Sequence, residues 1–190
     1  DIDSSDFYVS QHEIISVINK LQLGKSRDPF QLLSEHYKYA TSDIFNDYLT
    51  KLINRIFHSK QIPTSLSTSI IIPLVKSHKK SLNDPNNYRG ISLLPIITKI
   101  LELIVLEKCP QLTDHNNSQF GFVKASSSIH AELIIQDTIR YYNNNGSPVY
   151  ICSLDIEKAF DCCNWNTLFT KLLDKIIPNT VLNFLIQIYL

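Results

Sequence analysis

A single carboxylate ends an apolar run in the last quarter of this 190-residue sequence. Asp155 follows residues 149–154, which are mostly apolar and come after a cluster of turn-forming residues at 143–148. This pattern predicts a buried strand that delivers Asp155 to the edge of a sheet, where ligands and catalytic groups collect. A simpler interpretation is that Asp155 caps the helical turn 156–160, because Asp is common at such junctions. Spacing alone favours the cap.

Cationic residues are concentrated in the middle of the chain, although its net charge is zero. A neutral balance counts against a nucleic-acid-binding protein, for which a basic balance is typical. Between residues 76 and 99, however, one carboxylate, Asp84, accompanies the cations Lys76, Lys79, Lys80, Arg89 and Lys99. A locally positive segment of this kind is compatible with phosphate binding.

Two segments rich in β-branched residues surround these cations. Residues 67–76 and 88–94 predict a pair of strands, and the connection 77–87 is polar, basic and full of turn formers. Strands joined in this way form a ribbon with Lys76 near the end of one strand and Arg89 near the start of the other. The two cations are therefore expected to lie close together.

Helices are predicted on both sides of the ribbon, which gives an α+β fold. A capping box at Ser10 and Glu13 starts the first helix, Asp28 and Pro29 start the second, and Pro95 opens a later one. The expected ranges are 10–24, 28–39, 42–58, 95–108, 126–142 and 165–173, followed by an apolar segment at 180–190. The helix 42–58 carries a broad apolar stripe that is typical of a core face: Ile44, Phe45, Tyr48, Leu49, Leu52, Ile53, Ile56 and Phe57.

Four blocks of the sequence resemble a known family when they are taken in order. Leu154-Asp155-x-x-x-Ala159-Phe160-Asp161 resembles motif A of reverse transcriptases, specifically that of non-LTR (LINE-type) retrotransposons. The blocks Ile71-Ile-Pro-Leu-Val-Lys76, Tyr88-Arg-Gly-Ile-Ser-Leu-Leu-Pro95 and Gln119-Phe-Gly-Phe122 precede it in the family's order. The resemblance implies an RNA-directed DNA polymerase, a nucleotidyltransferase that uses an RNA template, a DNA primer and deoxynucleotide triphosphates.

The resemblance also implies a metal site. In this family two Mg²⁺ ions, for which Mn²⁺ can substitute, bind the motif A carboxylate, here Asp155 with the backbone carbonyl of Ile156. Two-metal polymerases need further carboxylates, and the family supplies them from an Asp-Asp pair in motif C. This sequence contains no Asp-Asp dipeptide. The chain by itself is therefore expected to be inactive, as part of a larger polymerase whose motifs B and C follow motif A.

The remaining site residues are assigned by the same resemblance. Phe160 matches the steric gate that excludes a 2′-hydroxyl, although an aromatic residue packed into the core is the ordinary alternative. Lys76 and Arg89 match residues that hold the triphosphate and the template, and solvated surface charges are the alternative. Positioning of the template and the palm is implied for Gln119, Phe120, Gly121 and Phe122.

The family match implies a right-hand polymerase in which helices pack on the β-ribbon and on an incomplete antiparallel sheet. Its expected parts are a mobile acidic lead at 1–9, the N-terminal helices and fingers at 10–145, and the start of the palm at 146–190. Val123, Ala125 and Ser126 stand where the family usually has Arg, Gly and Arg. A decayed copy that keeps only non-catalytic nucleic-acid binding is therefore one alternative, and an α/β protein-interaction domain is another.

Composition narrows the setting in which the protein works. No apolar run is long enough for a transmembrane span, so no membrane partner is expected, and the acidic first residues do not fit a signal peptide. The four cysteines lack metal-binding spacing and are interpreted as reduced thiols. An intracellular location follows, in the nucleus and the cytoplasm for the parent element. The sequence leaves the oligomeric state open.

Overall fold

The computed structural model describes residues 7–59 and 62–189. The chain divides into two compact units, of which the first combines Asp1–Leu112 with Phe169–Leu190 and the second is Thr113–Leu168. Within the described ranges, eight α-helices and one two-stranded antiparallel sheet give an α+β fold, which confirms the predicted class. None of the described helices is both long and apolar enough to cross a membrane.

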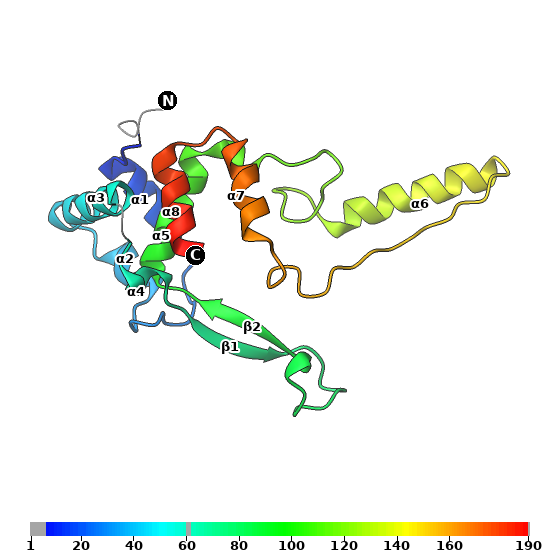
Figure 1. The fold of residues 1–190 in the computed structure, drawn as a ribbon, viewed down its shortest axis with the longest axis horizontal. Helices are drawn as coiled ribbons and strands as arrows, with labels where there is room; N and C mark the ends of the chain where they lie inside the picture. Colours follow the sequence, from blue (N-terminus) through cyan, green and yellow to red (C-terminus); the bar gives the residue numbers. More distant parts are fainter. Residues whose placement is uncertain (1–6, 60–61, 190) are drawn as a thin grey trace. The chain divides into compact units, whose positions relative to one another are not determined.

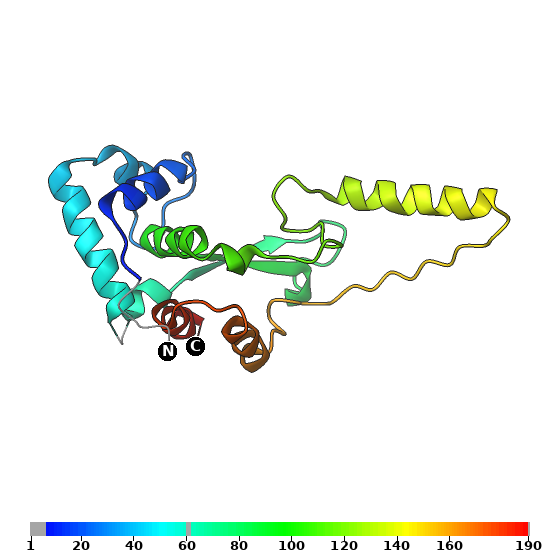
Figure 2. The same cartoon turned by 90° about the horizontal axis from the view of Figure 1, so that it is seen from above.

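Helices that pack on one another form the first unit (Figures 1 and 2). α1 packs on α2, α3 and α5, while α8 packs on α3 and α4. Their bounds are α1 Gln11–Lys20, α2 Ser34–Tyr39, α3 Asp43–His58, α4 Thr64–Ser67, α5 Ile96–Lys108 and α8 Asn179–Tyr189. The core of this unit therefore combines helices from the two ends of the sequence.

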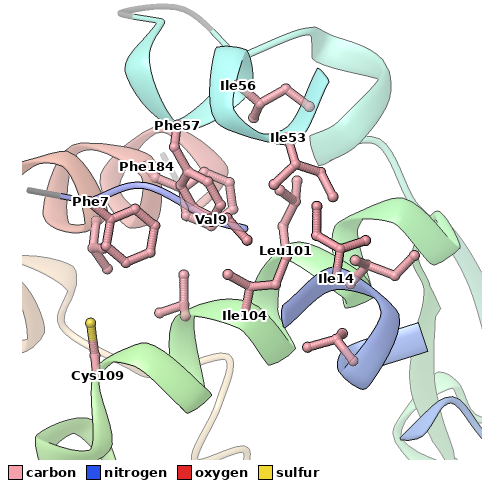
Figure 3. Close-up of a cluster of buried hydrophobic side chains, with 14 of the residues drawn as sticks. Phe7, Val9, Ile14, Ile53, Ile56, Phe57, Leu101, Ile104, Cys109 and Phe184 are labelled. Atoms are coloured by element: carbon pink, nitrogen blue, oxygen red, sulfur yellow. The ribbon is translucent and has the colours of Figure 1, made fainter. Parts of the chain in front are cut away.

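Aromatic side chains bring those two ends together (Figure 3). The ring of Phe57 lies 4.8 Å from the ring of Phe7, at an edge-to-face angle, and 4.9 Å from the ring of Phe184. Edge-to-face and tilted pairs at this separation are favourable beyond the area that they bury. Buried aliphatic residues surround the rings, among them Ile14, Ile53, Leu101 and Ile104.

The first helix begins as its capping box predicts. The Ser10 hydroxyl accepts a hydrogen bond from the Glu13 N–H (3.3 Å), and the Glu13 carboxylate accepts one from the Ser10 N–H (2.7 Å). Each bond satisfies a backbone donor that the first turn of a helix leaves unpaired. α1 ends at Lys20, earlier than the glycine stop at Gly24.

The residues just before α1 are packed, which corrects part of the expected mobile lead at 1–9. Residues 1–6 lie outside the described residues, but Phe7 and Val9 are buried in the core. Val9 is also clamped by a side chain of α3, because its N–H donates to Asn54 Oδ1 (2.8 Å) and its carbonyl accepts from Asn54 Nδ2 (2.7 Å). A buried backbone segment with both polar groups paired is held in place.

The second helix starts later than predicted. α2 begins at Ser34 instead of near Asp28, and its end at Tyr39 is as expected. The Asp28 side chain, only 3% exposed, accepts hydrogen bonds from the Phe30 and Leu32 N–H groups (both 2.8 Å) and from the Ile96 N–H (3.1 Å). Asp28 therefore shapes a loop and caps the start of α5, so it cannot serve as the cap of α2.

Helix α3 has the predicted range, with Ser42 as its N-cap, but its apolar stripe is wider than the core that it faces. Leu49, Ile53, Ile56 and Phe57 are buried, whereas Ile44, Tyr48 and Leu52 are exposed. The exposed residues repeat every four positions, so they form one outward-facing row. The prediction that the whole stripe is core was therefore wrong for this row.

The predicted ribbon is present as β1 (Ile70–Val75) and β2 (Tyr88–Leu93), paired antiparallel with Ile70 opposite Leu93 and Val75 opposite Tyr88. Its residues are exposed or half-buried on both faces. The expectation that helices pack on the ribbon is therefore corrected: the described helices pack on one another, and the ribbon extends away from them in both views (Figures 1 and 2).

The second unit consists of one long helix and extended chain. α6 (Ser128–Asn144), with Ser127 as its N-cap, confirms the predicted helix, yet none of its residues is buried. α7 (Trp165–Leu173) begins in this unit, but its residues from Phe169 onward belong to the first unit, and Phe169 and Leu172 pack against the core of that first unit.

The strand predicted at 149–154 is absent, which corrects the sequence interpretation. These residues are irregular and, apart from the half-buried Val149, exposed, and Figures 1 and 2 show this segment running apart from α6. A strand is stable only when a neighbour bonds its backbone N–H and C=O groups. In the part of the chain that the structure describes, β1 and β2 form the sheet and pair only with each other.

The ion pair between Glu13 and Lys108 makes stability depend on pH. Burial raises the Glu13 pKa, but hydrogen bonds from Lys108 (2.8 Å) and Ser10 outweigh it and lower that pKa from 4.5 to about 2. A carboxylate whose pKa is lower in the folded than in the unfolded protein stabilises the fold at pH values above the unfolded pKa. This stabilisation is lost as the pH falls through the folded pKa.

We therefore expect the free energy of unfolding to fall by about 1 kcal/mol between pH 5 and pH 2 on account of Glu13, a value reduced for solvent screening because the side chain is 38% exposed. Urea unfolding of the wild type and of Glu13→Gln across this range measures the contribution as the difference between the two pH profiles. Parallel profiles would contradict the assignment.

Candidate functional site

The end of the ribbon brings the two predicted cations to one face. Arg89 lies opposite Leu74 in the register of the strands, and the Lys76 N–H continues the ladder by donating to the Asn87 carbonyl (2.7 Å). Side chains alternate along a strand, so Lys76 shares a face with Leu74 and hence with Arg89. Diagonal neighbours of this kind lie about 7–8 Å apart at the backbone. This register is compatible with the expected proximity of Lys76 and Arg89, which stays a prediction.

Both cations are exposed to solvent. The Lys76 ammonium donates to the Asn86 carbonyl (3.0 Å), which fixes it beside the loop that follows. Within the described ranges, neither side chain forms an ion pair with a carboxylate. Their charge is accordingly available to an anion from outside the chain.

The loop 77–87 adds further charge next to this pair. His78, Lys79 and Lys80 are exposed along it. The loop returns through the short 3-10 helix η2 (Pro85–Asn87), whose N-cap Asp84 accepts a hydrogen bond from the Asn86 N–H (2.9 Å). The two lysines of this short connection, together with Lys76 and Arg89, outnumber its one carboxylate, Asp84, and give a local positive potential in a chain of zero net charge.

Asp155 lies in the exposed, irregular segment of the second unit, and the preceding Leu154 is 91% exposed. Ile156, whose carbonyl the family uses as a ligand, is exposed as well. A pair of Mg²⁺ ions needs several converging oxygen ligands. Across the described residues there is no group of three or more His, Cys, Asp or Glu side chains that could hold a metal ion. The residues present therefore do not fit a two-metal centre by themselves.

Phe160 is 84% exposed, so the described structure does not support the alternative that it is a core residue. It lies in a series of turns in which Lys158 has a left-handed backbone (φ 53°) and the Cys163 N–H donates to the Phe160 carbonyl (3.3 Å). An aromatic ring presented on a turn is free to meet a ligand. The gate assignment stays a prediction.

The block Gln119 to Phe122 forms a tight turn. Gln119 Nε2 donates to the Gly121 carbonyl (3.0 Å), and Phe122 takes a left-handed backbone (φ 60°) with its side chain 99% exposed. A bulky residue rarely adopts positive φ, because its Cβ then crowds the backbone. Phe120 is half-buried. The positioning role of Gln119, Phe120, Gly121 and Phe122 stays a prediction.

The predicted site residues fall into two groups. Lys76 and Arg89 lie together in the first unit, whereas residues 119–122 and the Asp155 segment belong to the second, so each group is considered separately. Sequence reasoning does not single out Asn87, a buried polar residue at the foot of the basic loop. The available signal is weak, because Asn87 follows another Asn in a run of turn formers.

Comparisons with known proteins match residues of both groups, and Lys76 lies just before the family match. A family model described as "Reverse transcriptase (RNA-dependent DNA polymerase)" matches residues 77–190, which is more than half of the chain. The match begins at the basic loop and includes β2, the Gln119 turn and Asp155.

Three curated proteins are similar over most of the chain. A putative 115 kDa protein in the type-1 retrotransposable element R1DM of Drosophila melanogaster is 25% identical over 134 residues, which are 67% of this chain and 12% of that protein. A retrovirus-related Pol polyprotein from the type-1 element R1 of Bradysia coprophila is 24% identical over 163 residues (84% and 16%). The corresponding polyprotein from the type-2 element R2DM of Drosophila melanogaster is 21% identical over 156 residues (81% and 14%). The chain therefore spans less than a fifth of the length of these relatives.

Proposed function

This chain belongs to the reverse transcriptase (RNA-dependent DNA polymerase) family, and from that premise we propose that it supplies the fingers and the first part of the palm of a non-LTR retrotransposon polymerase. The family works with an RNA template, nucleotide substrates and divalent metal ions. The proposal adds a DNA primer as partner and the nucleus and cytoplasm as the place of action of the parent element. It assigns residues 10–145 to the N-terminal helices and fingers, and 146–190 to the start of the palm.

The observation that carries this proposal is the shared face of Lys76 and Arg89 beside the basic loop 77–87. A guanidinium pairs with two phosphate oxygens at once, and an ammonium adds a point charge. Two such groups at the end of an exposed ribbon form a surface for the triphosphate of a nucleotide or for the backbone of a template strand. We infer that phosphate binding is the task of this end of the ribbon.

The resemblance assigns Asp155 and Ile156 to the catalytic centre of the parent polymerase and Phe160 to the sugar of the incoming nucleotide. All three residues are exposed, as expected for residues that contact substrate or other parts of the polymerase. Since the described residues place no group of three or more potential ligands around Asp155, we infer that the remaining ligands come from elsewhere in the parent. We therefore propose that this chain binds nucleic acid and does not polymerise by itself.

Replacing Lys76 or Arg89 with Ala is expected to weaken binding of an RNA–DNA duplex and to reduce the dependence on salt. Each lost phosphate contact should lower the slope of log K against log salt by about 0.7–0.9. A fluorescence titration at several salt concentrations measures both quantities. Arg55→Ala, which removes an exposed cation from α3, is the matched control and should leave the slope unchanged. A wild-type slope in both test variants would remove the two residues from the site.

A further inference from the structure

We propose that Asn87 is a positioning residue: its buried side-chain amide folds the loop 77–87 in advance and so holds Lys76 and Arg89 ready for phosphate groups. The inference rests on the proposed function, since it explains how the ribbon presents the cations that were assigned to phosphate binding. It adds a residue that touches no ligand itself.

The Asn87 side chain crosses the base of the loop and is paired on both ends. Its Nδ2 donates to the Ser77 carbonyl (2.9 Å) and to the Ser81 carbonyl (3.2 Å), and its Oδ1 accepts from the Ser77 N–H (3.1 Å). The residue is only 1% exposed although it sits between exposed neighbours. Both N–H donors and the oxygen of this buried amide are in use. Breaking one of these bonds is costly, because water cannot replace it in a buried site.

The Asn87 backbone connects the same loop to the ribbon. Its carbonyl accepts from the Lys76 N–H (2.7 Å), and its N–H donates to the Asp84 carbonyl (3.0 Å). Asn87 thus bonds Lys76, the residue directly after β1, as well as the start and middle of the loop and the turn before β2. Arg89 lies two residues further on and the Lys76 ammonium rests on the Asn86 carbonyl, so both cations are tied to this junction.

The other side-chain bonds of the loop are exposed and therefore compete with water. They join Asp84 to Asn86, Ser81 to the Asn83 N–H, Ser77 to the Lys79 N–H, the Lys76 ammonium to the Asn86 carbonyl and the Tyr88 hydroxyl to the Leu82 carbonyl (2.8 Å). Exposed bonds of this type contribute little net free energy. Order in the loop is thus expected to depend mainly on Asn87. A loop already ordered in the free protein does not have to lose conformational entropy when phosphate binds.

This role predicts a distinctive pair of effects on binding. Asn87→Ala removes the three side-chain bonds. Asn87→Asp keeps the size of the side chain but replaces its donating NH2 group by a carboxylate oxygen, which cannot donate to the Ser77 and Ser81 carbonyls. Both variants are expected to bind an RNA–DNA duplex about tenfold more weakly, because ordering the loop then opposes binding. The salt slope should stay as in the wild type, because the same cations still reach the phosphates in the complex.

The experiment uses the full chain with Asn87→Ala, Asn87→Asp and, as matched control, Asn83→Ala, which removes an exposed amide from the same loop. Fluorescence titration with an RNA–DNA duplex gives affinity and salt slope, and hydrogen exchange reports protection of the loop amides. The expected result is weaker binding and faster exchange in residues 77–87 for the two Asn87 variants, with the control like the wild type. In the unmodified protein, the Ser77 N–H should exchange more slowly than its exposed neighbours, a measurement that needs no variant.

Wild-type affinity in both Asn87 variants, or an unprotected Ser77 N–H in the unmodified chain, would overturn the inference. A smaller slope of log K against log salt in the Asn87 variants would also overturn the inference. It would mean that a phosphate contact is lost, and not that the loop 77–87 is less ordered. Failure of the proposed function gives a different result. In that case Lys76→Ala and Arg89→Ala leave the salt slope unchanged, whatever the Asn87 variants do.

Discussion

Primer extension by this chain alone, on an RNA template with Mg²⁺ or Mn²⁺, is expected to give no product. A longer protein that carries the same residues in frame with the rest of its polymerase is expected to extend the primer. In that protein Asp155→Asn should slow extension by about a thousandfold. Stabilisation of transition-state charge by a bound metal is worth several kcal/mol, and each 1.36 kcal/mol corresponds to about a factor of ten in rate.

The physical reason lies in the surroundings of Asp155. Its segment is exposed and pairs with no strand in the described ranges, and no cluster of three potential ligands forms there. Mg²⁺ gives up water reluctantly and binds weakly to one or two carboxylates in the absence of substrate phosphates. The chain therefore lacks a rigid frame for the reacting groups as well as a full set of ligands.

Glu157→Gln in the longer protein is the matched control for this experiment, because Glu157 is a second exposed carboxylate two residues away. It should leave the rate of extension close to that of the wild type. Extension by the 190-residue chain, abolished by Asp155→Asn, would contradict the prediction. It would mean that a second carboxylate of this chain completes the metal site.

Asp28→Ala is expected to destabilise the first unit by about 3–5 kcal/mol. The substitution leaves three backbone N–H groups without their charged acceptor: that of Ile96, which is buried, and those of Phe30 and Leu32, which are part-buried. An unpaired buried donor costs about 1–3 kcal/mol, and bonds to charged groups lie at the upper end. Urea unfolding followed by far-UV circular dichroism measures the loss.

Asp28→Asn separates the contribution of the bond to α5 from that of the loop. One amide oxygen can still accept from Phe30 and Leu32, but the amide nitrogen then faces the Ile96 N–H, donor against donor. We expect a loss between those of the wild type and of Asp28→Ala. Asp43→Ala, at the exposed first turn of α3, should cost less than about 1 kcal/mol. Equal stabilities of Asp28→Ala and Asp43→Ala would disprove the capping role of Asp28.

Elements whose ends are determined by neighbouring residues could be predicted from the sequence. Ser10 with Glu13 specifies the start of α1 and Ser42 the start of α3, because each cap acts within one turn of its own helix. Pro95 correctly predicts where α5 begins, although the side chain that caps this helix is that of Asp28. The start of α2 could not be predicted in this way. Asp28 has the right type for a cap, but its carboxylate bonds the Ile96 N–H, 68 residues further along the chain.

In the candidate site, too, features set by residues close in sequence could be predicted, and features set by contacts across the fold could not. β-branched runs on both sides of a polar connection predict the pairing of β1 with β2, and with it the proximity of Lys76 and Arg89. The strand at 149–154 was wrong because a strand needs partners, and an apolar run carries no information on whether they are present. The role of Asn87 was not predicted, because it depends on three hydrogen bonds that its side chain forms only in the folded loop.

The contact of Phe57 with Phe7 and with Phe184 has a consequence for synthesis on the ribosome. Phe184 is translated after the whole of the second unit, so the aromatic cluster cannot close while the earlier helices emerge. Until then, the apolar faces of α3 and α4 that later meet α8 are open to solvent and to other nascent chains. Incomplete cores of this kind are prone to aggregation. A chaperone that shields these faces until α8 emerges would therefore raise the yield of folded protein.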